Sequence, residues 1–415
     1  MDMKKYSIVA LICILTASIC WQCGVSKIKN PTITHKSDSN KATIKFQLRK
    51  EYSFNQGEIK INNKFLGARF NEISQQNDST FTLTILPENS PINSSPWFAF
   101  KVWSQSPKNL YFKLKYPTTV HRYNPKQSID GLHWTNIPSI SLNADSSEAS
   151  FKIQTKNDTL CIAAQELISS TMAYQWIDSL GALSFIRKQI IGKSLLNNPI
   201  SALKSNTSDG KKIIVVLSRQ HPPEVTGYMA MQSFVNTITG NTELAKNFRN
   251  EFQIIIIPLL NPDGVNEGNW RHSAAGVDLN RDWDLFKQPE TAAVKDFLLD
   301  LTANNKAKVY FGIDFHSTYH DVFYINEDNA QQKTNAPGFT KEWLKGMENS
   351  LPGFKPSVRP SPNGGNVSKS WMGRALRAEA LTYEVGDNTP RPMLKLKGQV
   401  AAEQMMSLLL KRNLN

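Results

Sequence analysis

The sequence has 415 residues, which is enough for two domains or for one large domain with an appendage. Hydrophobic residues make up 40% of it and charged residues 20%, so the chain can build a substantial core, and wholesale disorder and collagen-like structure are excluded. Lys and Arg outnumber Asp and Glu by 48 to 35, but the excess is spread along the chain without a basic block interleaved with aromatic residues, so we expect no nucleic-acid partner.

The N-terminus has the pattern of a secretory signal. Two lysines precede an apolar run over residues 6–19, which has the length of a signal-peptide core and is too short to span a bilayer as a stable helix. Cys20 and Cys23 follow this run, where a bacterial lipoprotein carries its acylated cysteine. We therefore expect residues 1–23 to be a signal peptide. The protein is then exported to the periplasm or the cell envelope, either with a lipid anchor as its membrane attachment or after simple cleavage near Ser18.

Residues 27–156 predict an antiparallel β-sandwich domain. Short segments of alternating apolar and polar residues are separated there by clusters of Gly, Asn, Pro and Ser, which is typical of such a fold. The segments are residues 42–48, 80–86, 98–103 and 110–114.

The pattern changes over residues 157–412, where β-branched runs alternate with helical stretches. The strand candidates are residues 212–217, 252–257, 309–313 and 380–385. The helix candidates are residues 225–239, 289–304, 340–350 and 398–411. Nearly continuous apolar strands with intervening helices predict an α/β domain whose mixed, mostly parallel sheet is covered by helices on both faces.

Three residues have the chemistry of a zinc site. His221 and Glu224 follow the strand at 212–217, and a ring nitrogen and a carboxylate at this spacing can converge on one metal ion, although an isolated pair of this kind is more often a surface His beside a helix-opening Glu. His316 lies near the end of the strand at 309–313, at the edge where open α/β sheets bind ligands. Two His and one Glu leave zinc an open fourth position, so we expect one zinc ion per chain.

The segment between these ligands is the most informative part of the chain. It starts with Asn261-Pro-Asp-Gly264, continues through Gly268-Asn-Trp-Arg271 and ends with Asp278-Leu-Asn-Arg281. Together with the ligands on either side, this spacing resembles the zinc carboxypeptidase family, most closely the branch that contains the cytosolic carboxypeptidases. That branch also has a β-rich domain before the catalytic one. The resemblance covers the chain from about residue 157 to its end, and it implies the zinc carboxypeptidase fold and hydrolysis of the C-terminal peptide bond of peptides or proteins.

The same resemblance implies roles for four residues of this segment. Arg271 would stabilise the oxyanion of the tetrahedral intermediate, and Asn280 and Arg281 would hold the terminal carboxylate of the substrate. These roles suit a guanidinium, which binds a carboxylate bidentately and stabilises a developing oxyanion in a dry site. Asp278 would orient the zinc-bound imidazole of His221. Capping of a turn is the alternative role for Asp278.

Two further residues come from the C-terminal part. Glu384 ends the last predicted strand, where a buried carboxylate is costly unless it has a partner or a task. In the family, the Glu at this place is the general base. Lys369 falls where relatives place the bottom of the specificity pocket, and a lysine there favours an acidic terminal side chain. A loop lysine in water is the alternative. The mobile tyrosine of digestive members is missing from residues 359–371, so no residue is assigned that role.

Two other functions stay open. Some relatives cleave D-glutamyl bonds in murein, and an envelope location would bring the protein to that substrate. A peptide-binding protein on an inactive scaffold would lack a ligand or the base, whereas His221, Glu224, His316 and Glu384 are all present. No protein partner is predicted beyond the substrate.

Overall fold

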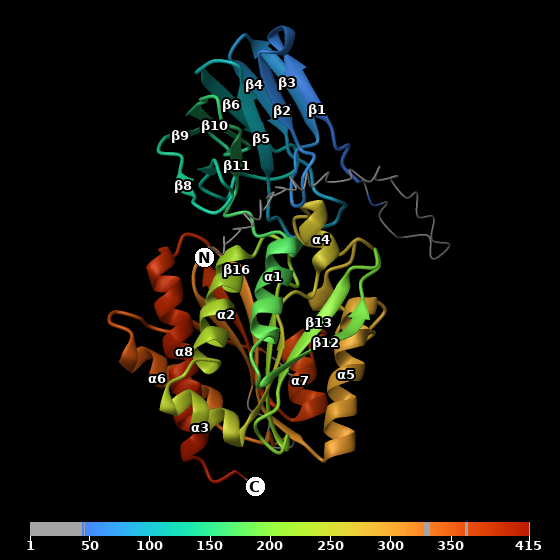
Figure 1. Cartoon of the computed structure of the whole chain (residues 1–415), viewed down its shortest axis with the longest axis vertical. Coiled ribbons are helices and arrows are strands. Elements are labelled where there is room, and N and C mark those ends of the chain that lie inside the picture. Colours follow the sequence, from blue (N-terminus) through green and yellow to red (C-terminus); the bar gives the residue numbers. More distant parts are fainter. Residues whose placement is uncertain (1–43, 45, 328–332, 362–363, 415) are drawn as a thin grey trace, which may run out of the picture. The chain divides into compact units, whose positions relative to one another are not determined.

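A computed structural model describes residues 44, 46–327, 333–361 and 364–414 (Figure 1). The predicted signal peptide, with Cys20 and Cys23, lies outside these residues. Residues Ala42–Asn415 form one compact unit, in which a β-sandwich precedes an α/β domain. Within the described part of the chain, no helix is both long enough and apolar enough to span a membrane.

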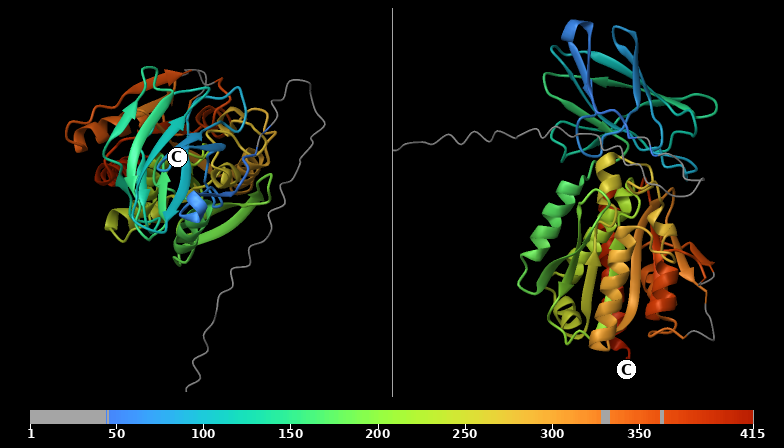
Figure 2. Two further views of the ribbon diagram at one scale, coloured as in Figure 1. Left: turned by 90° about the horizontal axis from the view of Figure 1, so that it is seen from above. Right: turned by 90° about the vertical axis from the view of Figure 1, so that its right-hand side faces the viewer.

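The sandwich consists of a six-stranded and a five-stranded sheet (Figure 2). The first sheet has the order β1 (Glu51–Phe54), β2 (Ile59–Asn62), β5 (Ala99–Ser104), β11 (Leu160–Ala163), β7 (Lys126–Ser128) and β8 (Thr135–Asn136), with the turn η1 (Asn55–Gly57) between β1 and β2. The second has the order β3 (Glu72–Asn77), β4 (Thr80–Thr84), β6 (Asn109–Lys115), β10 (Glu148–Gln154) and β9 (Ile140–Leu142). Apolar residues of both sheets form one core, in which the rings of Phe100 and Phe112 lie 4.9 Å apart.

Three details of the sandwich differ from the prediction. β11 pairs with β5 and β7, so the sandwich extends to residue 163 and not 156, because this apolar run completes its core. β4 and β6 are parallel, whereas the other strand pairs of the sandwich are antiparallel. The described residues of segment 42–48 form no strand, since Gln47 is held by side-chain hydrogen bonds from its Nε2 to the carbonyl oxygens of Ala68 and Glu267.

The α/β domain contains an eight-stranded mixed sheet. Its order is β12 (Ile186–Lys193), β13 (Pro199–Ser205), β15 (Gln253–Ile257), β14 (Lys212–Ser218), β16 (Lys308–Thr318), β19 (Glu379–Gly386), β17 (Val322–Asn326) and β18 (Val358–Ser361). The four central strands β15, β14, β16 and β19 are parallel, and antiparallel strands flank them on both sides. This confirms the predicted mixed sheet.

Helices cover both faces of this sheet (Figures 1 and 2). One face packs against α1 (Ser170–Gly181), α2 (Val225–Ile238), α3 (Glu243–Glu251), α6 (Phe339–Ser350) and α8 (Arg391–Lys411), and the other against α5 (Pro289–Asn305) and α7 (Ser368–Leu376). Successive residues of a strand point to opposite faces, so Ile214 belongs to the first core and Ile213 to the second. The short helices α4 (Pro262–Glu267) and η2 (Leu279–Arg281) lie in the long connection after β15.

The predicted start of the last helix was wrong. α8 begins at Arg391, whereas the prediction begins it at Gly398. A Cβ atom on Gly398 would lie 2.4 Å from the carbonyl oxygen of Ala230 in α2. This glycine therefore marks the place where α8 crosses α2, and not a helix end.

Candidate active site

Three parallel strands bring the predicted ligands and base to one edge of the sheet. β14, β16 and β19 are neighbours, so their carboxyl ends lie together. His221 follows β14, His316 lies near the end of β16, and Glu384 lies directly opposite His316 in β19. Glu224 is the N-cap residue of α2, which starts just after His221.

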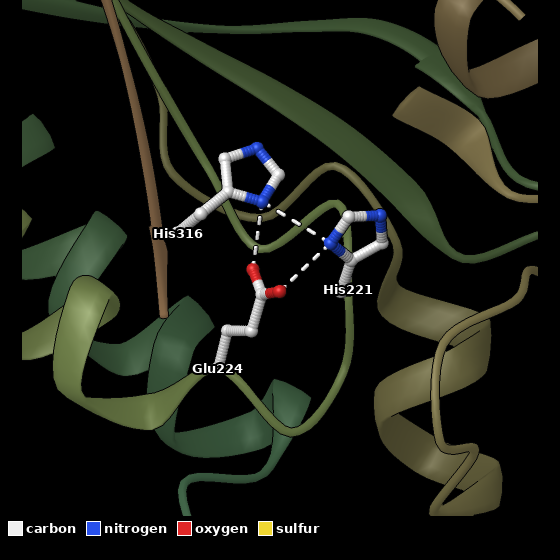
Figure 3. A group of neighbouring side chains, drawn as sticks. All are labelled: His221, Glu224 and His316. Carbon is white, nitrogen blue, oxygen red and sulfur yellow. Dashed lines mark hydrogen bonds and ion pairs between the residues drawn. The ribbon is translucent and has the colours of Figure 1, made fainter. Parts of the chain in front are cut away.

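The side chains of His221, Glu224 and His316 converge on one point (Figure 3). The Nδ1 atom of His221 is 2.8 Å from Oε1 of Glu224, and Nδ1 of His316 is 2.7 Å from Oε2 of the same carboxylate. The two Nδ1 atoms are 3.1 Å apart, and all three side chains are buried. Two nitrogens and a carboxylate grouped in this way are a ligand set that catalytic zinc sites use, and this group could hold a metal ion.

The outer contacts of the two histidines also fit a metal ion. The Nε2 atom of His221 is 2.9 Å from Oδ1 of Asp278, and Nε2 of His316 is 2.9 Å from Oδ2 of Asp314. A carboxylate at Nε2 favours the proton on that atom, which leaves the lone pair of Nδ1 directed at the shared point.

Electrostatics favour positive charge at this point. Burial alone lowers the pKa of His316, but the carboxylates of Asp314 and Glu224 raise it well above its usual value. The two histidines in turn lower the pKa of Glu224 despite its burial. The three side chains thus stabilise a cation between them, whether protons or a metal ion supply the charge.

Asp314 is a functional residue that the sequence reasoning missed. It is fully buried, and it also accepts hydrogen bonds from Nε2 of Gln220, at 2.5 Å, and from the hydroxyl of Ser368. Residues two apart in a strand point to the same face, so the spacing of Asp314 and His316 is the signal that could have identified it.

Asp278 connects His221 to Arg271. Besides its contact with His221, its Oδ1 accepts a hydrogen bond from the backbone N–H of Asn280 at 2.8 Å, and its Oδ2 accepts one from Nε of Arg271 at 2.6 Å. Although burial raises the pKa of Asp278, the charges of His221 and Arg271 lower it well below its usual value. Asp278 therefore caps η2 and also contacts the imidazole of His221, so the two roles considered for it do not exclude each other.

A cleft of about 440 Å³ lies over these side chains. Its lining includes the predicted site residues His221, Glu224, Arg271, Asn280, Arg281, Lys369 and Glu384. His316 and Asp278 lie directly behind it, in contact with Glu224 and His221. The structure therefore brings together the residues that the sequence singled out, from segments far apart in the chain.

The two residues predicted to bind the substrate carboxylate are adjacent but differ in exposure. Asn280 is buried, and its Oδ1 accepts a hydrogen bond from the backbone N–H of Ser368 at 2.9 Å. Arg281 is exposed, and its Nη1 donates to the carbonyl oxygen of Asn280 at 2.8 Å. Asn280 is thus fixed by the fold, whereas the guanidinium of Arg281 keeps other N–H groups for a ligand.

Glu384 has the environment of a proton carrier. Burial, and after it the charge of Glu224, raises the pKa of Glu384 to about 7. Its Oε2 is buried and has no hydrogen-bond partner among the described residues. A carboxyl group whose pKa lies near neutrality can both accept and return a proton at physiological pH.

Lys369 lies in α7 and not in an exposed loop. Its side chain lines the cleft, the residue is only 2% exposed, and Nζ donates to Oδ1 of Asn326 at 2.9 Å. Burial lowers the pKa of Lys369 to about 8, an effect that Glu327 opposes. The alternative of a lysine pointing into water is therefore wrong.

The cleft also contains side chains that the sequence did not indicate. Tyr319 and Tyr324 line it from the end of β16 and from β17, outside the stretch that lacks a tyrosine. Arg122 lines it from the sandwich, with its Nε 2.8 Å from Oδ2 of Asp387 and its Cζ 4.7 Å from the ring of Tyr319. No local motif marks Arg122, because its place depends on the packing of the two domains.

Comparison with known proteins matches part of the chain to a family. Residues 173–353 match the model of the zinc carboxypeptidase family. The chain contains a zinc carboxypeptidase domain. Zinc, the predicted cofactor, is the metal of this family, and the His-Glu-His group provides a site for it.

This zinc carboxypeptidase domain is similar to curated cytosolic carboxypeptidases. It is 32% identical over 133 residues to cytosolic carboxypeptidase 3 of Bos taurus. The aligned region is 31% of this chain and 13% of the bovine protein. It is 31% identical over 150 residues to cytosolic carboxypeptidase 6 of Caenorhabditis elegans. Here the aligned region is 35% of this chain and 33% of the nematode protein. The chain thus spans a third or less of the length of these relatives.

Solved structures share the fold over both domains. A metallo-carboxypeptidase from Burkholderia cenocepacia superposes with a TM-score of 0.70 at 18% identity, covering 85% of this chain and 98% of that one. A metallo-carboxypeptidase from Pseudomonas aeruginosa gives a TM-score of 0.68 at 19% identity, covering 84% and 98%. The predicted zinc carboxypeptidase fold, preceded by a sandwich, is therefore confirmed.

Proposed function

We propose that the protein is a zinc-dependent carboxypeptidase that removes the C-terminal residue of peptides or proteins. The observation that carries the proposal is a single cleft lined by the proposed ligands His221 and Glu224, by Arg271, and by Glu384, a half-buried carboxyl group of raised pKa. Such a combination of metal ligands, base and fixed cation suits metal-assisted hydrolysis of a peptide bond.

The residues divide the chemistry between them. Bound zinc supplies a water molecule of lowered pKa and polarises the substrate carbonyl. The carboxylate of Glu384 accepts a proton from the attacking water and passes it to the leaving amine nitrogen. Arg271 provides positive charge where the carbonyl oxygen becomes negative. Arg281 and Asn280 donate hydrogen bonds to the terminal carboxylate, which selects a chain end over an internal peptide bond.

A preference for acidic terminal residues is a finer part of the proposal. Lys369 is a buried cation in the cleft wall, and its ammonium group has Asn326 as a neutral partner. A terminal Glu or Asp side chain would supply the opposite charge in a site largely removed from water, where charge pairing is strong.

Export is a separate proposal, supported by the signal-like pattern of residues 1–23. Cell fractionation is expected to find the protein in the envelope or periplasm. Labelling with a radioactive fatty acid, compared between the wild type and Cys20→Ser and Cys23→Ser variants, distinguishes a lipid anchor from simple cleavage. Accumulation of the uncleaved chain in the cytoplasm contradicts the proposal.

The activity can be tested with peptides that differ only in the C-terminal residue, with Glu, Asp, Lys and Phe as variants. Mass spectrometry is expected to show the loss of one residue with the zinc-loaded protein and not with Glu384→Gln. Glu379→Gln is a matched control, because Glu379 lies at the other end of β19, next to Thr334. Its activity should equal that of the wild type.

A γ-D-glutamyl peptide in the same panel tests the alternative function. Cleavage of this linkage without shortening of any L-peptide would make the protein a murein peptide hydrolase, and the role of Arg281 would then move to another carboxylate. Binding without cleavage of any member of the panel would identify an inactive scaffold.

A further inference from the structure

The segment that joins β4 to β5 leaves the sandwich and reaches the loop that carries Arg271. Glu88 in this segment is 1% exposed, and its carboxylate accepts hydrogen bonds from three consecutive backbone N–H groups. Oε2 accepts from Trp270 at 2.8 Å, and Oε1 accepts from Arg271 at 3.0 Å and from His272 at 2.7 Å. One side chain of the sandwich thus fixes the main chain on both sides of Arg271.

Neighbouring residues of the sandwich hold the same loop. The side chain of Asn89 is 2.7 Å from Nδ1 of His272 and donates to the carbonyl oxygen of Gly276 at 2.9 Å. Arg69, which is 1% exposed, donates to Oδ1 of Asn269 at 2.9 Å. Trp270 belongs to the hydrophobic core of the sandwich. These contacts make the loop part of the interface between the domains.

Arg271 is consequently held at two places. Its backbone is fixed by Glu88, and its Nε is fixed by Oδ2 of Asp278 at 2.6 Å. Among the described residues, neither terminal nitrogen of its guanidinium has a hydrogen-bond partner, although the side chain lines the cleft. The two anchors therefore restrict the side chain while leaving its terminal N–H groups for a substrate oxygen.

We propose that Glu88 is a positioning residue, which acts through Arg271 and makes the sandwich part of the catalytic apparatus. This inference rests on the proposed function, because it assumes that Arg271 stabilises the oxyanion. Electrostatic stabilisation depends on donors that are already in place when charge develops, so a displaced loop should lower the rate of the chemical step more than substrate binding.

The chemistry of the contact requires a carboxylate. Three N–H donors converge on two oxygens, and an ionised Glu is an acceptor only. Glu88→Gln keeps the shape but replaces one oxygen by an amino group that faces a donor, and it removes the charge that strengthens these bonds. The variant should loosen the loop without disturbing the zinc ligands, none of which contacts Glu88.

The test is a double-mutant cycle with a structural readout. The zinc-loaded wild type, Glu88→Gln, Arg271→Ala and the double variant are compared for kcat and KM with a peptide that ends in Glu, for zinc content, and for hydrogen–deuterium exchange over residues 269–274. We expect Glu88→Gln to lower kcat by about 10- to 100-fold, with KM and zinc content within twofold of the wild type and faster exchange at Trp270, Arg271 and His272. In the Arg271→Ala background it should have no further effect on kcat.

Controls separate positioning from general stability. Glu148→Gln makes the same substitution in β10, where Glu148 forms a surface ion pair with Lys113, and it should leave kcat and the exchange of the loop unchanged. If Glu88→Gln does not fold, Glu88→Asp keeps the charge on a shorter side chain and should show the same pattern with a smaller loss. An unchanged kcat, or an equal fold-loss in both backgrounds, would overturn the inference.

The experiment distinguishes failure of the proposed function from failure of the positioning role of Glu88. A wild-type protein that shortens no peptide overturns the proposed function and with it any catalytic role for Glu88. An active wild type whose kcat is unaffected by Glu88→Gln overturns the positioning role alone.

Discussion

Asp314 contacts His316 at Nε2, the ring nitrogen that faces away from Glu224. It is fully buried, and its Oδ2 lies within hydrogen-bonding distance of His316, Gln220 and Ser368. Such a carboxylate fixes the orientation of the imidazole and raises its basicity, and loss of the charge at such positions typically weakens metal binding by about 10- to 100-fold.

We therefore expect Asp314→Asn to lower zinc affinity by about 10- to 100-fold. Competition with a chromophoric chelator measures the affinity directly, without any assay of hydrolysis. Asp300→Asn, on the outer helix α5, is the matched control and should bind zinc as the wild type does. Equal affinities of the wild type and Asp314→Asn would show that the contact with His316 does not support the metal.

Lys369 allows a test of specificity through pH. Burial lowers its pKa to about 8, so the side chain is charged below this pH and neutral above it, while a terminal Glu side chain is ionised throughout this range. We expect the ratio of kcat/KM for peptides ending in Glu and in Gln to be constant below about pH 7 and to fall as pH rises through 8. The ratio cancels the titration of groups that act on both substrates.

The matching variant is Lys369→Met, which removes the charge and keeps most of the length. Its ratio should be low and independent of pH. A wild-type ratio that stays flat up to pH 9 would mean that Lys369 does not pair with the substrate.

At the scale of elements, the close packing of α2 against β16 sets the position of His316. A Cβ atom on Gly227 would lie 2.2 Å from the carbonyl oxygen of His316 and 2.6 Å from its carbonyl carbon, closer than real Cβ atoms approach other atoms. Helix α2 also begins with the ligand Glu224 as its N-cap. Helix and strand thus each carry a proposed zinc ligand and are packed in close backbone contact.

Gly227→Ala is expected to push α2 and β16 apart and to weaken zinc binding by about 10-fold or more, because a shift of about 1 Å at an active site has a large effect. Gly364→Ala is the control, since its added methyl group meets no atom within 4 Å. Calorimetric titration of zinc into both variants makes the comparison. Wild-type affinity in Gly227→Ala would show that the contact can relax without moving His316.

The elements differ in how well the sequence predicts them. The central strands β14, β15, β16 and β19 have nearly continuous apolar residues because both of their faces are covered, and this pattern was recognised. The edge strand β12 has four exposed residues in a row and was missed, since half of its surface is polar. The four-residue strand β18 was also missed, because a segment of that length gives no measurable periodicity.

The residues of the site also differ in how well the sequence predicts them. Residues within motifs, such as His221, Arg271 and Glu384, could be assigned from spacing, because the resemblance to a family fixes their order. Arg122 and Glu88 could not, since they lie in the sandwich and approach the site only through tertiary contacts. Local patterns carry no information about contacts between residues separated by more than a hundred positions.

At the scale of the whole molecule, the two domains are joined by buried polar contacts. Nε of Arg122 is 2.8 Å from Oδ2 of Asp387, with side chains 8% and 4% exposed, and Arg391 binds Glu166 and Gln165 beside them. Trp270 of the α/β domain packs in the core of the sandwich. We therefore expect the domains to unfold together in one transition.

Arg122→Met should destabilise the folded protein by about 3–5 kcal/mol, because it leaves the buried carboxylate of Asp387 without its partner. Urea denaturation followed by circular dichroism measures this loss. The control Lys113→Met removes one partner of an exposed ion pair and should change stability by less than about 1 kcal/mol. Two separate transitions in the wild type would contradict the joint unfolding of the domains.

The pairing of His316 with Glu384 places a metal ligand and the proposed base on adjacent strands at the same level. Their backbones are about 4.8 Å apart, a spacing set by the interstrand hydrogen bonds and independent of the surrounding side chains. This distance should therefore stay the same when the surrounding side chains are substituted. Arg271 has no such backbone template, and its position depends on a loop held from another domain. Changes in the sandwich can therefore alter the rate of the chemical step through Arg271, while the spacing between His316 and Glu384 stays the same.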